Sequence, residues 1–281
     1  MGNKGRCLCG SVTWEVNGEP FSAYNCHCSM CQKIHGTAFG TYYRVKTEQF
    51  RWTGSGKTII SYNSSHLTRS ACDTCGSVVP FESKNHNGWA VPAGGHDLGK
   101  NIDCNIFVAD AAPWHRVSDD LPCFDQYPPG DDFLVIDNKF LTKRPEGVVR
   151  GSCLCGAVAY QVTAPFKIAH NCHCSRCRYA RSAAHASNGF TSFDAVQFVK
   201  GEEYLKSYKV PDARFFTQVF CGICSSKMPR LDSERGIAVI PLGSLDDDPD
   251  IRPIDHLNVG NKAGWHKITD DLPKFDEMPP G

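Results

Sequence analysis

Fourteen of the sixteen cysteines fall into two sets of seven that occur in the same order along the chain. Each set has a CxC pair, a CHCSxC triplet and a CxxC pair. The first set is Cys7, Cys9, Cys26, Cys28, Cys31, Cys72 and Cys75, and the second is Cys153, Cys155, Cys172, Cys174, Cys177, Cys221 and Cys224. Thiols at such short spacing converge on a metal more readily than they join distant loops as disulfides. The fold must therefore bring cysteines that are far apart in the sequence of each set close together in space. Cys104 and Cys123 lie outside both sets, and we expect no role for them.

The repeat extends beyond the cysteines. Residues 114–130 and 265–281 share eleven of seventeen positions, and both segments end in Pro-Pro-Gly. Two copies with a long period indicate two domains rather than a solenoid. We predict a first domain at 3–130, a linker at 131–147 and a second domain at 148–281. The two domains could pack as an internal pseudo-dimer, and the apolar linker residues 133–136 could pack against one of them.

Composition disfavours several classes of protein. Thirty basic residues balance thirty acidic ones, so no global field attracts nucleic acid or an anionic membrane. No apolar run approaches the roughly 18 residues of a membrane span. The first residues have no apolar stretch behind their charges, so we expect no secretory signal. Abundant thiols with no export signal predict a cytoplasmic location or another reducing space.

The segments between the motifs predict a mostly β fold. Several are rich in β-branched and aromatic residues or alternate in polarity, as half-buried strands do. The expected strands include residues 11–16, 40–45, 58–62, 157–162 and 236–240. Only the stretches after Cys28 and Cys174 are typical of helices, and both are short.

The CxC and CxxC pairs of each copy provide four soft ligands, which favour a closed tetrahedral zinc site. The expected ligands are Cys7, Cys9, Cys72 and Cys75 in the first copy, and Cys153, Cys155, Cys221 and Cys224 in the second. These sites would fasten the fold and perform no chemistry. Glycines beside the ligands would let backbone N–H groups turn toward the sulfurs; they are Gly10, Gly76, Gly156 and Gly222.

The CHCSxC triplet has three thiols and no fourth cysteine at a repeated position. Three ligands with one open position are typical of catalytic zinc, where a substrate thiol can bind. The alternative is a second structural zinc whose fourth ligand is His27, His35 or another side chain. His27 and His173 could support the ligands or be solvated loop residues. We expect Trp114 and Trp265 to anchor each final turn in the core, with the charges of the following Asp-Asp-Leu-Pro segments in solvent.

The order CxCG, CHCSxCxxxxG, CxxCG and a late APWxxxxDDLPxF segment resembles the glutathione-dependent formaldehyde-activating family, also called the centromere protein V family. The resemblance covers nearly the whole chain, twice. It implies two tandem Mss4-like zinc-binding β domains, with two zinc ions in each domain and four in the chain. The second copy departs slightly, with Ser182 in place of Gly36 and Gly264 in place of a proline. The first copy has Asn105 where the second has His256.

The resemblance implies formation of S-hydroxymethylglutathione from formaldehyde and glutathione, a carbon–sulfur lyase reaction in reverse. We therefore expect a zinc-dependent carbon–sulfur lyase whose substrate is a small-molecule adduct of glutathione or another thiol. The catalytic metal would be held by Cys26, Cys28 and Cys31, and by Cys172, Cys174 and Cys177. One half alone could be active. The alternative is a non-catalytic zinc module that binds a protein or nucleic acid, and the balanced charge disfavours nucleic acid.

Overall fold

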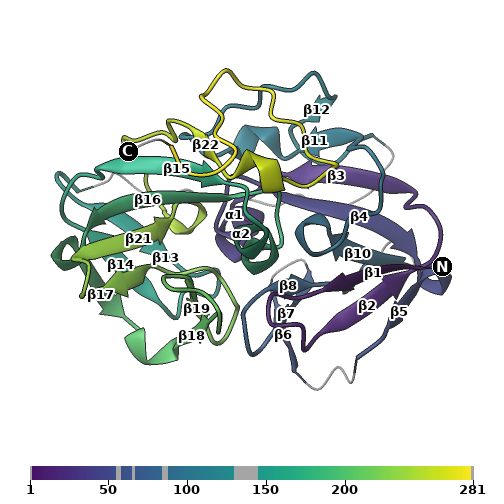
Figure 1. Ribbon diagram of the computed structural model, residues 1–281, viewed down its shortest axis with the longest axis horizontal. Helices are drawn as coiled ribbons and strands as arrows, with labels where there is room; N and C mark the ends of the chain where they lie inside the picture. The colour runs from purple at the N-terminus through teal and green to yellow at the C-terminus, as the bar shows by residue number, and fades with distance from the viewer. Residues whose placement is uncertain (1, 55–57, 65–66, 84–87, 130–144, 280–281) are drawn as a thin grey trace.

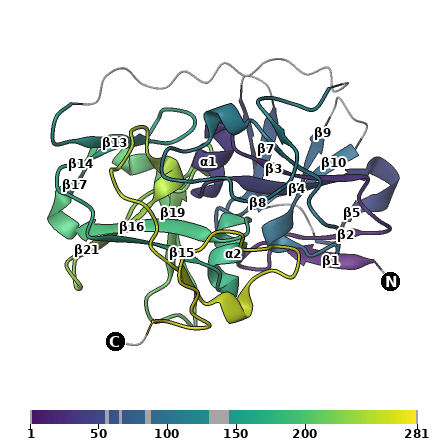
Figure 2. The same ribbon diagram turned by 90° about the horizontal axis from the view of Figure 1, so that it is seen from above.

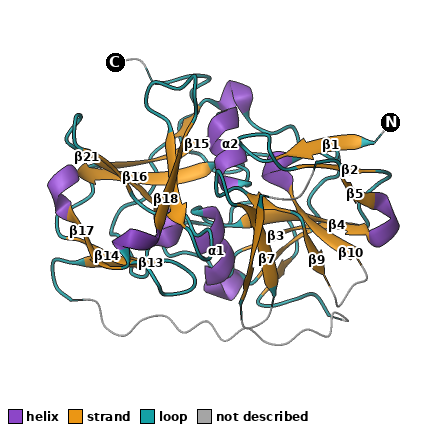
Figure 3. Cartoon of the chain, turned by 90° about the horizontal axis from the view of Figure 1, so that it is seen from below, coloured by secondary structure: helices purple, strands orange, loops and turns teal. Residues whose placement is uncertain are grey.

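The computed structural model describes residues 2–54, 58–64, 67–83, 88–129 and 145–279. The apolar stretch 133–136 lies outside the described residues. Two groups of strands stand side by side, one from each half of the chain (Figure 1). Two short helices, α1 (Ser29–His35) and α2 (Ser175–Arg181), lie between them (Figure 3). None of the helices in these ranges is long and apolar enough to cross a membrane.

The first half forms three sheets within its described part, ordered β1-β2-β5, β12-β11-β3-β4-β10-β9 and β6-β7-β8. Their strands are β1 (Asn3–Arg6), β2 (Thr13–Val16), β3 (Ser22–Cys26), β4 (Gly40–Lys46), β5 (Phe50–Trp52), β6 (Ile59–Asn63), β7 (Thr68–Cys72), β8 (Val78–Val79), β9 (Phe81–Ser83), β10 (Gly88–Pro92), β11 (Cys104–Ile106) and β12 (Cys123–Phe124).

The second half repeats this plan with sheets β13-β14-β17, β20-β21-β16-β15-β22 and β18-β19. Its strands are β13 (Val149–Ser152), β14 (Ala159–Val162), β15 (Ile168–Cys172), β16 (Ala186–Ser192), β17 (Val196–Lys200), β18 (Leu205–Lys209), β19 (Thr217–Cys221), β20 (Arg230–Asp232), β21 (Ile237–Pro241) and β22 (His256–Leu257). The predicted mostly β class is therefore confirmed, and so are the two short helices after Cys28 and Cys174. The strands expected at 11–16 and 157–162 begin two residues later, because the CxC turns extend that far.

Each CHCSxC triplet begins at the end of a central strand. Cys26 ends β3, and Cys172 ends β15. Most strand pairs are antiparallel, but β11 runs parallel to β3 and places Asn105 beside Asn25. In the same way β22 places His256 beside Asn171 on β15. Because alternate residues of a strand point to opposite faces, these polar residues lie on the face of the sheet away from the cysteines.

The two halves pack on each other through reciprocal contacts. Helix α1 lies against the 3₁₀ turn η7 (Leu242–Ser244), and α2 lies against the equivalent turn η3 (Ala93–Gly95). A Cβ atom on Gly94 would lie 2.1 Å from the backbone nitrogen of Ala183. One on Gly243 would lie 2.4 Å from the carbonyl oxygen of Gln32. Only glycine allows such close approach of the two backbones.

The hydrophobic core continues across this contact. One cluster of buried side chains includes Trp14 and Val91 from the first half and Ala169 and Leu242 from the second. It also includes both tryptophans of the repeated tails, Trp114 and Trp265, which are buried as expected. At the edge of the contact, the Lys33 ammonium pairs with Asp246 and donates to the Ser152 carbonyl at 2.8 Å. Figure 2 shows the two halves and the intervening helices from above.

Candidate metal centres and a pocket between the halves

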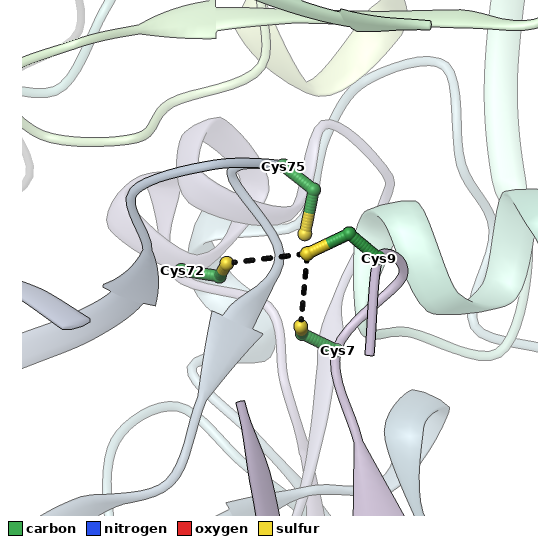
Figure 4. Close-up of side chains that lie close together, drawn as sticks. All are labelled: Cys7, Cys9, Cys72 and Cys75. Carbon is green, nitrogen blue, oxygen red and sulfur yellow. Dashed lines mark hydrogen bonds between the residues drawn. The ribbon is translucent and has the colours of Figure 1, made fainter. Parts of the chain in front are cut away.

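The CxC and CxxC pairs of the first half come together beside the end of β7 (Figure 4). The sulfurs of Cys7, Cys9, Cys72 and Cys75 all lie within 4.8 Å of one another. The distance is 3.5 Å from Cys7 to Cys9 and 3.7 Å from Cys9 to Cys72. Four thiolates at about 2.3 Å from one zinc would lie about 3.8 Å apart, so the cluster has the dimensions of a tetrahedral site. Hydrogen bonding from Cys75 lowers the pKa of Cys9 to about 6, which favours the thiolate that binds a metal.

The second half builds the same cluster from Cys153, Cys155, Cys221 and Cys224. The sulfur of Cys155 lies 3.4 Å from that of Cys153 and 3.8 Å from that of Cys221. Three ligands are buried and Cys155 is half-buried, as Cys9 is in the first half. Both clusters therefore fit a zinc ion by donor type, number and spacing.

The turns around these clusters direct backbone N–H groups at the sulfurs. Gly10 has a left-handed conformation with φ of +80°, and the Val12 N–H donates to the Cys7 sulfur at 3.3 Å. The second CxxC turn differs from the expectation for Gly222. There Ser225, the equivalent of Gly76, adopts the left-handed conformation with φ of +60°.

The triplet of the first half is closed. Cys26, Cys28 and Cys31 are 5%, 1% and 3% exposed. Both terminal nitrogens of Arg69, which is buried on β7, lie 3.8 Å from the Cys31 sulfur. The cavity beside the sulfurs measures only about 20 Å³. Its aromatic walls are Tyr24, Tyr42, Phe81, Phe107 and Tyr127. In this half the space beside the three sulfurs is therefore small and is bordered by a guanidinium and aromatic rings.

The triplet of the second half is more accessible. Cys172 and Cys174 are half-buried, and only Cys177 is buried. Gln218 aligns with Arg69, three residues before the CxxC motif, and so replaces the cation with a neutral amide. Asn258 aligns with Phe107, shares its left-handed backbone and donates to the Cys172 sulfur at 3.5 Å. The two triplets thus share their ligand positions but differ in the side chains that contact their sulfurs.

Neither histidine considered as a fourth ligand joins the first triplet. His35 binds the Tyr42 hydroxyl and the Arg181 carbonyl, each at 2.6 Å. His27 is 1% exposed and lies 3.1 Å from the Asn105 side-chain oxygen, on the opposite face of the strand from the sulfurs. Burial lowers the pKa of His27. The description of His27 as a solvated loop residue is therefore wrong.

Behind each triplet lies a series of hydrogen-bonded polar side chains, called here the polar chain of that half. In the first half, Asn105 connects His27 to Asp119, to which its amide donates at 2.7 Å. In the second half, His256 takes the place of Asn105. Its ring lies 2.8 Å from the ring of buried His173 and 3.0 Å from the Asp270 carboxylate. The first aspartate of each repeated tail thus has a structural partner, contrary to the expectation that these charges lie free in solvent.

Both polar chains border one pocket between the two halves, with a volume of about 390 Å³. The His27 and His115 rings stack at 5.8 Å on the first-half side, and the His173 and His266 rings stack at 5.5 Å on the other. Between these pairs, Phe39 meets its sequence equivalent His185. The sequence did carry one signal of this pocket, a histidine directly after each repeated tryptophan, but the expectation for these segments concerned the tryptophans alone.

The pattern of one protein family matches the chain in two places, residues 2–109 and 148–261; its description is "Glutathione-dependent formaldehyde-activating enzyme". The chain belongs to this family. Both copies of the formaldehyde-activating domain thus carry a complete set of seven cysteines, and the expected pair of Mss4-like β domains is confirmed.

Two individual proteins resemble this member of the formaldehyde-activating family. A protein of Halomonas elongata named "Putative glutathione-dependent formaldehyde-activating enzyme" is 32% identical over 132 residues, which cover 43% of this chain and 81% of the relative. A crystal structure of a Rhodobacter sphaeroides protein is 23% identical and covers 37% of this chain and 97% of its own, with a TM-score of 0.29.

Proposed function

We propose that the chain is a zinc-dependent carbon–sulfur lyase that acts on an adduct of glutathione or another thiol, and that the triplet of the second half carries the reaction. One observation carries the choice of half. Cys172 and Cys174 are half-buried, whereas Arg69 and five aromatic rings cover the equivalent sulfurs of the first half. Family membership and the name of the Halomonas relative support the reaction type.

In the cleavage direction, the carbon–sulfur bond of a thiohemiacetal breaks and its electrons leave with the sulfur. The hydroxyl group loses its proton as the carbonyl forms. A zinc ion held by Cys172, Cys174 and Cys177 would lower the pKa of the leaving thiol and so stabilise the thiolate. The Asn258 amide donates to the Cys172 sulfur, which fixes that ligand and offsets part of its negative charge.

The first-half triplet has a different role in this proposal. The Arg69 guanidinium beside Cys31 neutralises part of the charge of three buried thiolates, and the cavity beside them measures only about 20 Å³. A metal there would stabilise the fold, as would the metals of the two four-cysteine clusters. The full chain would then hold four zinc ions, of which one is catalytic. Its many free thiols suit a reducing compartment such as the cytoplasm.

Matched variants in the two halves test the proposal. Cys174→Ala should reduce turnover of S-hydroxymethylglutathione, or of another thiol adduct that the unmodified protein cleaves, to the uncatalysed rate. Cys28→Ala, the equivalent change in the closed triplet, should keep turnover once its folded state is confirmed by circular dichroism. Loss of turnover in Cys28→Ala alone would mean that the first half, not the second, carries the reaction. If neither change affects turnover, a non-catalytic zinc module becomes the better account.

A further inference from the structure

We propose that the pocket between the two halves is a second binding site, which takes an uncharged planar aromatic molecule. The site is separate from the metal centres. No cysteine of the four clusters lines the pocket, and none of its lining residues lines the small cavity beside Cys26, Cys28 and Cys31. The proposal therefore does not depend on the lyase activity.

The aromatic character of the ligand follows from the floor of the pocket. Phe39 lies 5.3 Å from the ring of His27, 5.5 Å from that of His115 and 5.6 Å from that of His185. On the other side His266 continues this surface and stacks on His173, which does not itself line the pocket. Flat rings at such distances favour another planar ring, by stacking or by edge-to-face contact. The volume of about 390 Å³ lies within the range of roughly 300–1,000 Å³ usual for small-molecule sites.

The neutral character of the ligand follows from the charges around it. Burial lowers the pKa of His115 to about 3 and that of His266 to about 4, so these rings are neutral near pH 7. The rim carries two cations, Arg116 and Lys267, against three carboxylates, Asp119, Asp120 and Asp270. An anion would find no excess positive charge, and a cation would lose its hydration against a floor of neutral rings.

The pocket has an entrance formed by the repeated tails. Residues 116–121 and 267–270 border it, and several of them are exposed. The tails meet at Ser118 and Thr269, whose hydroxyl oxygens lie 2.7 Å apart. These two residues are equivalent in the two copies. A ligand would therefore enter beside this contact and reach the ring-lined floor between the halves.

Three probes of one shape test the proposal on the metal-loaded full chain: 2-naphthamide, 2-naphthoate and 2-naphthylmethylamine. Isothermal titration calorimetry should give 2-naphthamide a dissociation constant of about 1 mM or lower, an ordinary affinity for a ligand of this size. The two charged probes should bind at least about tenfold more weakly. Absence of 2-naphthamide binding, or equal binding of a charged probe, would overturn the proposal.

A substitution that fills the pocket tests its location. Ile268→Trp fills the pocket from its half-buried rim and should abolish binding of 2-naphthamide, whereas Val199→Trp on exposed β17 should not. Binding that survives Ile268→Trp would place the ligand elsewhere.

Discussion

The rings of Phe39 and His185 meet edge to face with their centroids 5.6 Å apart, although the two residues occupy the same position in the two copies of the domain. Their contact brings equivalent positions of the two halves face to face, as does that of Ser118 with Thr269. The residue types differ across it, because an apolar ring faces an imidazole. Equivalent positions also differ in residue type near the triplets, where Arg69 of the first half aligns with Gln218 of the second. The duplication therefore kept the ligand sets while the surroundings diverged.

The metal content of the chain should be four zinc ions, one for each cysteine cluster. Changing Cys72 to Ser removes one ligand from a four-thiol cluster and should reduce the count to three. It should also lower the midpoint of urea unfolding, because metal binding and folding are coupled. Cys123→Ser, at an exposed cysteine outside both sets, is the control and should leave both quantities unchanged. Elemental analysis of tag-free protein measures the count, and about two zinc ions per chain would mean that both triplets are empty.

The contact of η3 with the end of α2 should be intolerant of any added atom. Gly94→Ala places a methyl group 2.1 Å from the backbone nitrogen of Ala183, so we expect it to lower the free energy of unfolding by about 1–3 kcal/mol. Gly264→Ala is a suitable control, because the exposed Gly264 faces only the flexible end of Asp97, at 3.1 Å. Urea denaturation compares the two variants. Equal stability of Gly94→Ala and the control would mean that the halves do not pack this closely.

The metal clusters could be predicted from the sequence because each ligand pair is local, as in Cys7 and Cys9. The mostly β class followed from residue preferences that are equally local. The closure of the first triplet could not be predicted, because Arg69 reaches Cys31 from a strand 38 residues further along the chain. The pocket was missed for a similar reason. It exists only where Phe39 of one half meets His185 of the other, and no spacing within a single copy indicates that contact.

The polar chain behind the second triplet should tolerate asparagine at position 256 better than alanine. In the first half, Asn105 already connects His27 to Asp119, so His256→Asn can keep the contact with His173. His256→Ala removes that partner from a histidine that is 0% exposed. Leaving a buried polar group unpaired costs about 1–3 kcal/mol. Urea unfolding at pH 7.5 should show this loss of stability for the alanine variant and a smaller loss for the asparagine variant. The reverse order would contradict the equivalence of the two polar chains.

Stability should fall with pH below about 6.5 through a buried histidine far from the cysteine clusters in sequence. His96 is 4% exposed, accepts a hydrogen bond from the Trp14 indole at 2.9 Å, and has its pKa lowered by burial from 6.5 to about 4. Between these two values the unfolded chain binds a proton that the folded chain does not. The contribution of neutral His96 to the free energy of unfolding is therefore complete above pH 6.5. It is lost as the pH falls toward 4, by about 1.4 kcal/mol per pH unit.

His96→Gln removes this titration while keeping an acceptor near the Trp14 indole. The variant will be less stable at pH 7.5, but between pH 6.5 and 5 its free energy of unfolding should fall by about 2 kcal/mol less than that of the unmodified chain. Urea denaturation of both proteins at half-unit pH steps measures the difference in slope. Other buried histidines and metal release affect both proteins equally and cancel in the comparison. Parallel curves over this range would show that the folded chain protonates His96 as readily as the unfolded chain does, so that its pKa is not lowered.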